Sequence, residues 1–126
     1  MKILFIGDVF GGAGRRALRR HLPDLVRERE VEFVVANAEN LAGGSGLAAE
    51  PVAELFRAGV HCLTGGNHTW DKREARAILE KDPRVLRPAN YPEPCPGSGL
   101  FLGRSEAGFP VAVLSLMGRV FMPPVD

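Results

Sequence analysis

Apolar residues along the chain form two kinds of pattern, short continuous runs and longer stretches with helical spacing, and the two alternate. The predicted strands lie at residues 2–6, 32–37 and 60–64, and the predicted helices lie at 15–30, at 49–58 and after Asp71. An order in which each strand is followed by a helix is typical of a sheet whose strands begin parallel. The pattern therefore predicts an α/β fold.

Local signals refine this assignment in the first half of the chain. The run at 2–6 is continuously apolar, which predicts a strand buried on both faces. A glycine-rich turn, GGAG at 11–14, follows it, and Pro23 is expected to kink or split the next helix. Asp71 with Glu74 three residues later matches a capping box, so Asp71 is expected to cap the third helix.

The remainder of the chain predicts an antiparallel hairpin. A short extended piece at 84–88 enters a proline-rich loop that ends near residue 99. Two apolar runs follow, at 99–104 and 110–118, separated by a turn with the sequence SEAG. The fold class predicted from the whole pattern is a sheet that starts parallel, followed by a later hairpin.

Composition narrows the class of protein. The chain has 126 residues, of which 45% are hydrophobic and 25% charged, which fits one globular domain and excludes a disordered or fibrous chain. A net charge of +1 indicates no clear nucleic-acid surface. No apolar stretch approaches the roughly 20 residues of a membrane span. Cys62 and Cys95 form no CxxC pair, which favours a reduced, cytoplasmic setting.

Polar residues follow each of the three predicted parallel strands. Asp8 follows the first strand, Glu39 and Asn40 follow the second, and Asn67 and His68 follow the third, with glycines in each of these segments or close to it. Taken singly, each residue could belong to a turn or a helix cap. Because the carboxyl ends of parallel strands share one edge where ligands bind, the three segments together predict a site.

The chemistry of these residues favours a metal ion. Two carboxylates, those of Asp8 and Glu39, would repel each other at the edge of an apolar sheet unless a positive group lies between them. No lysine lies directly beside these segments in the sequence, and the arginines nearest to Asp8 are Arg15 and Arg16. Oxygen donors with an imidazole suit Mn, Fe or Zn. His21 and His61 lie outside the three segments and are expected to be structural.

Glycines 11–14 allow a competing interpretation as a phosphate loop. Residues 12–17 match the pattern GxGxxA of dinucleotide-binding proteins, but Asp8 occupies the turn that a pyrophosphate would approach. No Gly-Lys-Ser/Thr sequence follows, which excludes a Walker loop. Backbone N–H groups of the GGAG turn could still bind a phosphate, and Arg15 is a speculative contact to it.

Five ordered motifs together resemble one protein family. They are GDVFGGAGR, NAENLAGGSG, TGGNHTWD, RPANYP and LMGRVFMP, and they run over essentially the whole chain. The combination is similar to the bacterial YmdB-like branch of the calcineurin-like metallophosphoesterases. The resemblance implies an α/β/β/α sandwich and a phosphodiesterase with two divalent metal ions, Mn or Fe first and Zn next. Such an enzyme would hydrolyse cyclic nucleotides or similar phosphodiesters through a metal-bridging hydroxide.

The resemblance also implies a role for each residue of the three segments. Asp8 would bind one metal ion, Glu39 would bridge the two ions, and Asn40 would be a further ligand of the first ion. Asn67 would bind the second ion. His68 would be the catalytic histidine, close to the substrate phosphate.

The sequence departs from the family in length. The family is about twice as long, and its second half carries histidine ligands in DFHAE-like and THTHV-like segments that are absent here. Residues 1–126 are therefore expected to form a single domain that is incomplete at its C-terminus. Two alternatives stay open: a catalytically inactive regulatory or interaction protein on the same fold, and a nucleotide-binding module that uses GGAGRRA. A homo-oligomer is compatible with the sequence.

Overall fold

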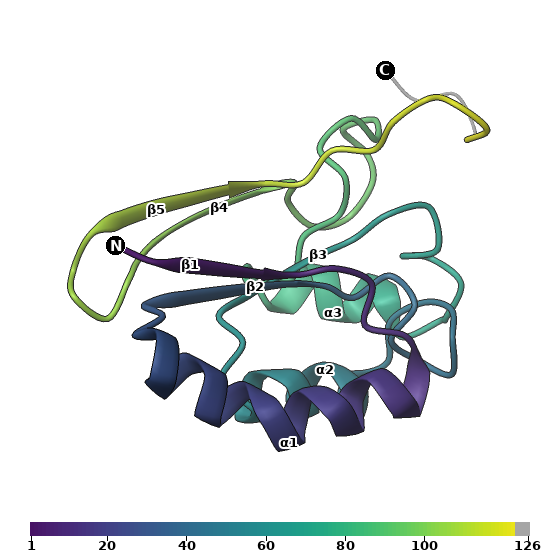
Figure 1. Cartoon of the computed structure of the whole chain (residues 1–126). Helices are drawn as coiled ribbons and strands as arrows, with labels where there is room; N and C mark the ends of the chain where they lie inside the picture. The colour runs from purple at the N-terminus through teal and green to yellow at the C-terminus, as the bar shows by residue number, and fades with distance from the viewer. Residues whose placement is uncertain (123–126) are drawn as a thin grey trace.

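A parallel sheet lies between a layer of helices and an antiparallel hairpin in the computed structural model, which describes residues 1–122 (Figure 1). The sheet contains β1 (Ile3–Ile6), β2 (Phe33–Asn37) and β3 (Cys62–Thr64), in the order β1-β2-β3. The helices are α1 (Gly11–Arg29), α2 (Ala49–Arg57) and α3 (Ala75–Lys81). The hairpin pairs β4 (Leu100–Arg104) with β5 (Pro110–Leu114). The predicted α/β fold, parallel sheet first and hairpin later, is confirmed.

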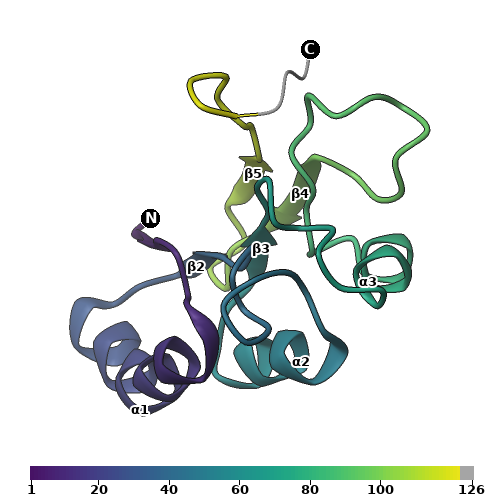
Figure 2. The same cartoon turned by 90° about the vertical axis from the view of Figure 1, so that its right-hand side faces the viewer.

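The central strand β2 separates two apolar cores. Val34 and Ala36 face the helices, where they pack with Leu18 of α1 and Leu55 of α2. The alternate residues of β2 face the hairpin, and their cluster consists of Phe33, Val35, Cys62, Leu86 and Val111. A strand covered on both faces is expected to be continuously apolar, as FVVA is. Figure 2 shows the helices and the hairpin on opposite sides of the sheet.

The prediction that the first strand is buried on both faces is wrong. β1 is an edge strand of the sheet, and only its residues that face the helices, Leu4 and Ile6, pack into a core. Ile3 and Phe5 point to the other face and are 51% and 62% exposed. The hairpin accounts for the difference, because its side chains pack against residues of β2 and β3.

The hairpin is apolar on both faces. Its inward side chains include Phe101 and Val113, which pack against the core beneath it. Its outward side chains include Leu100, Leu102 and Leu114, and Leu102 is 72% exposed. A hairpin that faces water normally alternates apolar and polar residues. Residues 1–122 thus supply three layers of the expected α/β/β/α sandwich and no second helical layer.

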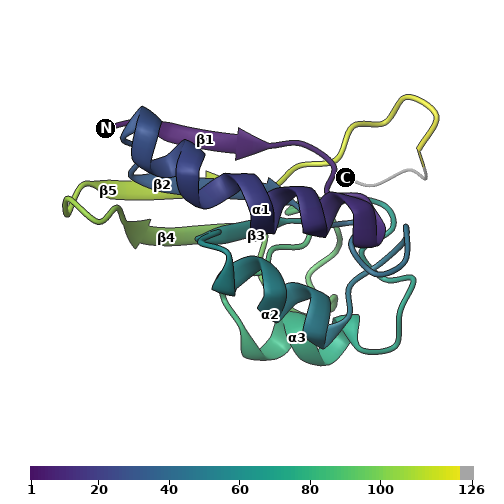
Figure 3. The same ribbon diagram turned by 60° about the horizontal axis from the view of Figure 1, so that its bottom comes forward.

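Helix α1 begins earlier than predicted and is not split at its proline. The GGAG segment forms its first turn, and Pro23 lies within one helix of 19 residues that is not split. The helix continues through Pro23, which costs a single hydrogen bond, because Leu18 and Leu22 before it and Val26 after it pack against the same core. Figure 3 shows α1 crossing the sheet as one element. Among the described residues, no helix combines the length and the apolar character that crossing a membrane requires.

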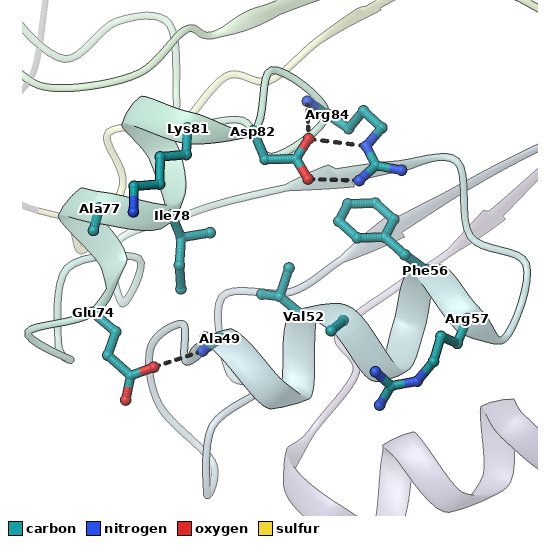
Figure 4. A pocket seen from close by; sticks show the side chains of 11 residues that line it. Ala49, Val52, Phe56, Arg57, Glu74, Ala77, Ile78, Lys81, Asp82 and Arg84 are labelled. Carbon is teal, nitrogen blue, oxygen red and sulfur yellow. Dashed lines mark hydrogen bonds and ion pairs between the residues drawn. The ribbon is translucent and has the colours of Figure 1, made fainter.

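The predicted capping box at the third helix is wrong. Helix α3 begins after Glu74, and no side chain caps it. Asp71 instead bonds to the hydroxyl of Ser45, and Glu74 accepts a hydrogen bond of 2.7 Å from the backbone N–H of Ala49 (Figure 4). Ala48, at the start of α2, has no polar side chain that could cap this helix. The two acidic residues therefore connect the segment before α3 to the loop before α2 and to the first residue of that helix.

A groove of about 520 Å³ lies between α2 and α3 (Figure 4). Its lining includes Val52, Phe56 and Ile78. Arg84 lies 3.9 Å above the ring of Phe56 and binds the Asp82 carboxylate through two nitrogens, at 2.9 and 2.7 Å. Hydrogen bonding to Arg84 lowers the pKa of Asp82 despite its partial burial. This pair holds the segment that leaves α3 against α2.

The two cysteines are expected to differ in reactivity. Cys62 is fully buried in β3, and burial raises its pKa to about 12, so almost no thiolate forms at about pH 8. Cys95 is half-buried in the proline-rich loop. We expect Ellman's reagent to modify Cys95 in the native protein and both thiols after denaturation. Rapid modification of both thiols in the native protein would contradict the buried position of Cys62.

Candidate functional site

The loops that follow β1, β2 and β3 meet at one edge of the sheet (Figure 2). Parallel pairing aligns the strands, with Ile6 opposite Ala36 and Asn37 opposite Thr64. Backbone hydrogen bonds continue this alignment past the strands. Val9 N–H donates to the Asn37 carbonyl at 3.0 Å, and Ala38 N–H donates to the Thr64 carbonyl at 2.9 Å. The segments carrying the predicted site residues are therefore tied to each other.

Three of the predicted site residues form a chain of hydrogen bonds. The Asn40 side-chain amide donates to Asp8 Oδ1 at 2.7 Å, and Asn40 Oδ1 lies 2.6 Å from His68 Nδ1. Asp8 has a φ of 33°, in a region that residues other than glycine rarely adopt. Such backbone strain occurs most often at functional sites. One side chain from each of the three loops thus takes part in a single network.

The carboxylate of Glu39 lies against the backbone of Gly66. A Cβ atom at position 66 would overlap both oxygens of this carboxylate. Glu39 Oε2 also accepts a hydrogen bond of 3.3 Å from the backbone N–H of His68. Asn67, between these residues, is half-buried, and its side chain makes no hydrogen bond within residues 1–122. Gly66 therefore provides the space in which the Glu39 carboxylate lies.

Arg15, the predicted phosphate contact, is bound within the fold. Its guanidinium donates to Glu54 Oε2 and to the Leu41 carbonyl, each at 2.7 Å. The first N–H of the GGAG segment, that of Gly11, donates to the Asn40 carbonyl at 3.0 Å. Both groups thus hold the loop that carries Glu39 and Asn40. The role of Arg15 in phosphate binding stays a prediction.

Two residues next to the site were not singled out from the sequence. Thr69 is fully buried, and its hydroxyl bonds to the backbone of Gly66. The Asn37 side-chain amide lies 3.4 Å from Glu39 Oε1, while its own Oδ1 is buried without a partner among the described residues. A polar residue that ends an apolar strand was a usable signal for Asn37. No local pattern marks Thr69, because its contacts come from the folded turn.

His61 and His21 lie apart from this network. His61 Nδ1 accepts the backbone N–H of Val34 at 3.0 Å, and its ring stacks on Phe33 with centroids 4.9 Å apart. Burial lowers the pKa of His61, although the nearby Glu106 opposes this shift. His21 is exposed on α1. The structural roles expected for these two histidines agree with their positions.

The donor chemistry of the site fits a divalent cation only in part. The carboxylates of Asp8 and Glu39 and the amides of Asn40 and Asn67 are oxygen donors of the kind that Mn²⁺ accepts. Within residues 1–122, neither carboxylate forms an ion pair with a basic residue. In the same part of the chain, no three His, Cys, Asp or Glu side chains are close enough to hold a metal ion. The site thus offers suitable ligands but an incomplete set.

The family model and the related proteins that match this chain agree with each other. Residues 4–126 match the family described as YmdB-like protein. A Bacillus subtilis protein named 2',3'-cyclic-nucleotide 2'-phosphodiesterase is 41% identical over 126 residues, which is 100% of this chain and 47% of that protein. The chain thus spans about half the length of the curated relatives it matches.

Two solved structures superpose closely on this fold. The crystal structure of a hypothetical protein from Thermus thermophilus is 44% identical, with a TM-score of 0.92 over 100% of this chain and 48% of that chain. The crystal structure of a novel phosphatase from Mycoplasma pneumoniae is 29% identical, with a TM-score of 0.89 over 100% of this chain and 46% of that chain.

Proposed function

Because this chain belongs to the YmdB-like protein family, we propose that it is part of a metal-dependent phosphodiesterase that acts on small phosphodiesters such as cyclic nucleotides. The observation that carries the proposal is the hydrogen-bonded network of Asp8, Asn40 and His68, with Glu39 beside it. The name of the Bacillus subtilis relative supports this substrate class. A phosphodiesterase needs positive charge near the phosphate. These residues have the donor atoms to bind divalent cations, which would supply that charge.

In this proposal, Asp8 and Asn40 would hold one divalent ion, Asn67 would hold a second, and Glu39 would be a ligand of both. Ions held there would supply positive charge and would make hydroxide available near neutral pH. Mn and Fe are the ions that the family suggests, and the donor types also suit Zn. In the present arrangement the Asn40 amide bonds to Asp8 and His68. Metal binding would therefore exchange at least one of these hydrogen bonds for a ligand bond.

His68 is the proton donor in this proposal. The Asn40 amide turns its NH₂ group toward Asp8, so its oxygen faces His68 Nδ1. An oxygen acceptor at this position favours the tautomer with the hydrogen on Nδ1. The other ring nitrogen, Nε2, is then free to hold a proton and deliver it to the departing oxygen of the phosphodiester. Asn40 thereby determines which nitrogen of His68 meets the substrate.

We also propose that the remaining ligands come from a part of the protein outside these 126 residues. The observation behind this step is that the site lacks a third ionisable ligand among residues 1–122. Such a part of the protein would cover Phe5 on the sheet and Leu102 on the hairpin, which are 62% and 72% exposed. Relatives about twice as long are compatible with such an addition.

The test measures hydrolysis of phosphodiesters by the full product of the gene. Activity is measured after a chelator has removed bound metal, and again after Mn²⁺ has been added back. Substrates are bis-p-nitrophenyl phosphate and the 2',3'- and 3',5'-cyclic forms of AMP. We expect activity only when Mn²⁺ is present. Activity that ignores chelators would refute the metal mechanism. Tight binding of NAD or ATP that ignores chelators would favour a nucleotide-binding module, and an empty site without activity would favour a regulatory protein.

A further inference from the structure

The hydroxyl of Thr69 makes two hydrogen bonds to a single neighbouring residue. Thr69 Oγ1 accepts the backbone N–H of Gly66 at 2.8 Å and donates to the backbone carbonyl of Gly66, also at 2.8 Å. The backbone N–H of Thr69 adds a longer bond of 3.3 Å to the same carbonyl. Thr69 has no exposed surface, so water cannot replace these bonds. One buried side chain therefore satisfies both polar groups of the Gly66 backbone.

The same hydroxyl occupies space that only glycine leaves free. A Cβ atom at position 65 would overlap Thr69 Oγ1 and would lie 2.7 Å from the Leu86 carbonyl oxygen. Gly65 and Gly66 are both buried. The pair of glycines at the end of β3 thus allows the turn to fold back tightly onto the Thr69 side chain.

Gly66 connects this turn to the Glu39 carboxylate. The carboxylate lies where a side chain at position 66 would otherwise be, so the position of the Gly66 backbone determines where it can lie. His68, two residues further along the turn, bonds to Glu39 through its backbone N–H at 3.3 Å and to Asn40 through its ring at 2.6 Å. A shift of the turn would therefore move a proposed metal ligand and the proposed acid together.

We propose that Thr69 is a positioning residue whose hydroxyl fixes the Gly66–His68 turn and, through it, the Glu39 carboxylate. The inference rests on the proposed metal site, because Thr69 itself touches neither a ligand oxygen nor the His68 ring. Residues that orient metal ligands typically contribute about 10–100-fold to metal affinity. Removing the hydroxyl would also leave the buried N–H and carbonyl of Gly66 with weaker partners.

The experiment compares Thr69→Val, which has a similar shape but no hydroxyl, with Thr69→Ser, which keeps the hydroxyl. Mn²⁺ affinity of the full gene product is measured by titration calorimetry, and amide hydrogen exchange of Gly66 is measured by NMR without metal. We expect about a tenfold loss of Mn²⁺ affinity and faster Gly66 exchange in Thr69→Val. Thr69→Ser should stay close to the native protein in both measurements.

Thr64→Val is the matched control. Thr64 is a buried threonine at the end of β3, and its hydroxyl makes no hydrogen bond within the described residues. This variant should keep both the Mn²⁺ affinity and the slow exchange of Gly66. Kinetics of the full gene product add a further comparison, in which Thr69→Val should lower kcat more than it raises KM.

The outcomes separate this inference from the proposed function. Equal losses of Mn²⁺ affinity in Thr69→Val and Thr69→Ser would overturn the role of the hydroxyl, as would native Gly66 exchange in Thr69→Val. Failure of the full gene product to bind Mn²⁺ would instead refute the proposed metal site. The exchange of Gly66 would then still decide whether the hydroxyl fixes the turn. If Thr69→Val does not fold, native-like affinity and exchange in Thr69→Ser support the proposal and their loss overturns it.

Discussion

Replacing Gly66 by alanine is expected to lower Mn²⁺ affinity by about 100-fold, at the upper end of the effect of residues that support metal ligands. The added methyl group would overlap the Glu39 carboxylate, which must then leave its place. The carboxylate would also lose the hydrogen bond from His68 N–H. Glu39→Gln should show a comparable loss of Mn²⁺ affinity. It removes the negative charge that Gly66→Ala displaces, and it leaves the turn in place.

The fold should tolerate this substitution. Gly66 does not have a positive φ, so its backbone conformation is open to alanine. The overlapping atoms belong to the end of the Glu39 side chain and not to the backbone. The thermal unfolding temperature of Gly66→Ala should therefore stay near that of the native protein. Gly65→Ala should lower the thermal unfolding temperature, because its methyl group would overlap the Leu86 backbone carbonyl.

Calorimetric titration with Mn²⁺ and thermal unfolding together test this prediction. Gly7→Ala is the matched control, since Gly7 follows β1 in the same edge of the sheet and nothing lies within 4 Å of its added methyl group. The double variant Gly66→Ala with Glu39→Gln should bind Mn²⁺ about as weakly as either single variant, because both act on one carboxylate. Native Mn²⁺ affinity in Gly66→Ala would show that the Glu39 carboxylate is not a ligand.

The second large effect is expected at His68. His68→Ala should reduce kcat of the full gene product by about 10²–10⁴-fold, which is the usual contribution of a general acid. Mn²⁺ affinity should remain close to native, since the contact of residue 68 with Glu39 comes from the backbone N–H, which alanine keeps. The expected pattern is thus a loss of turnover without a loss of metal.

Steady-state hydrolysis of 2',3'-cyclic AMP and calorimetric Mn²⁺ titration distinguish this role from metal binding. His21→Ala serves as the control, because His21 is exposed on α1 and takes no part in the network. Unchanged turnover in His68→Ala would remove the acid from the mechanism. A parallel loss of Mn²⁺ would instead make His68 a ligand.

Predictions from local sequence signals were wrong where a residue distant in the sequence supplies the deciding contact. The match of Asp71 and Glu74 to a capping box depends only on spacing. In the structure Asp71 bonds to Ser45 in the loop before α2, and Glu74 bonds to Ala49, the first residue of α2. Pro23 was expected to interrupt a helix that burial against the sheet keeps whole. In each case a tertiary contact outweighs a local preference.

The sequence by itself determined the order of the elements and the three polar segments of the site. The order of the elements follows from the apolar pattern, because periodicity indicates which faces are buried. Continuous apolar runs mark the parallel strands, helical spacing marks the helices, and two apolar runs joined by a turn mark the hairpin. Parallel strands place their carboxyl ends at one edge, so Asp8, Glu39 and His68 could be assigned to one site before any contact was known. These inferences depend on patterns of apolar and polar residues that are close together in the sequence.

Only the tertiary structure decided how the site is held together. The bonds from Asn40 to Asp8 and His68 join loops that lie far apart in sequence, as their separations of 32 and 28 residues indicate. The fit of the Glu39 carboxylate against Gly66 and the closure of that turn by Thr69 depend on atoms in contact. Hydrogen bonds and steric exclusion act over a few ångströms, and the folded chain alone brings these atoms within that range.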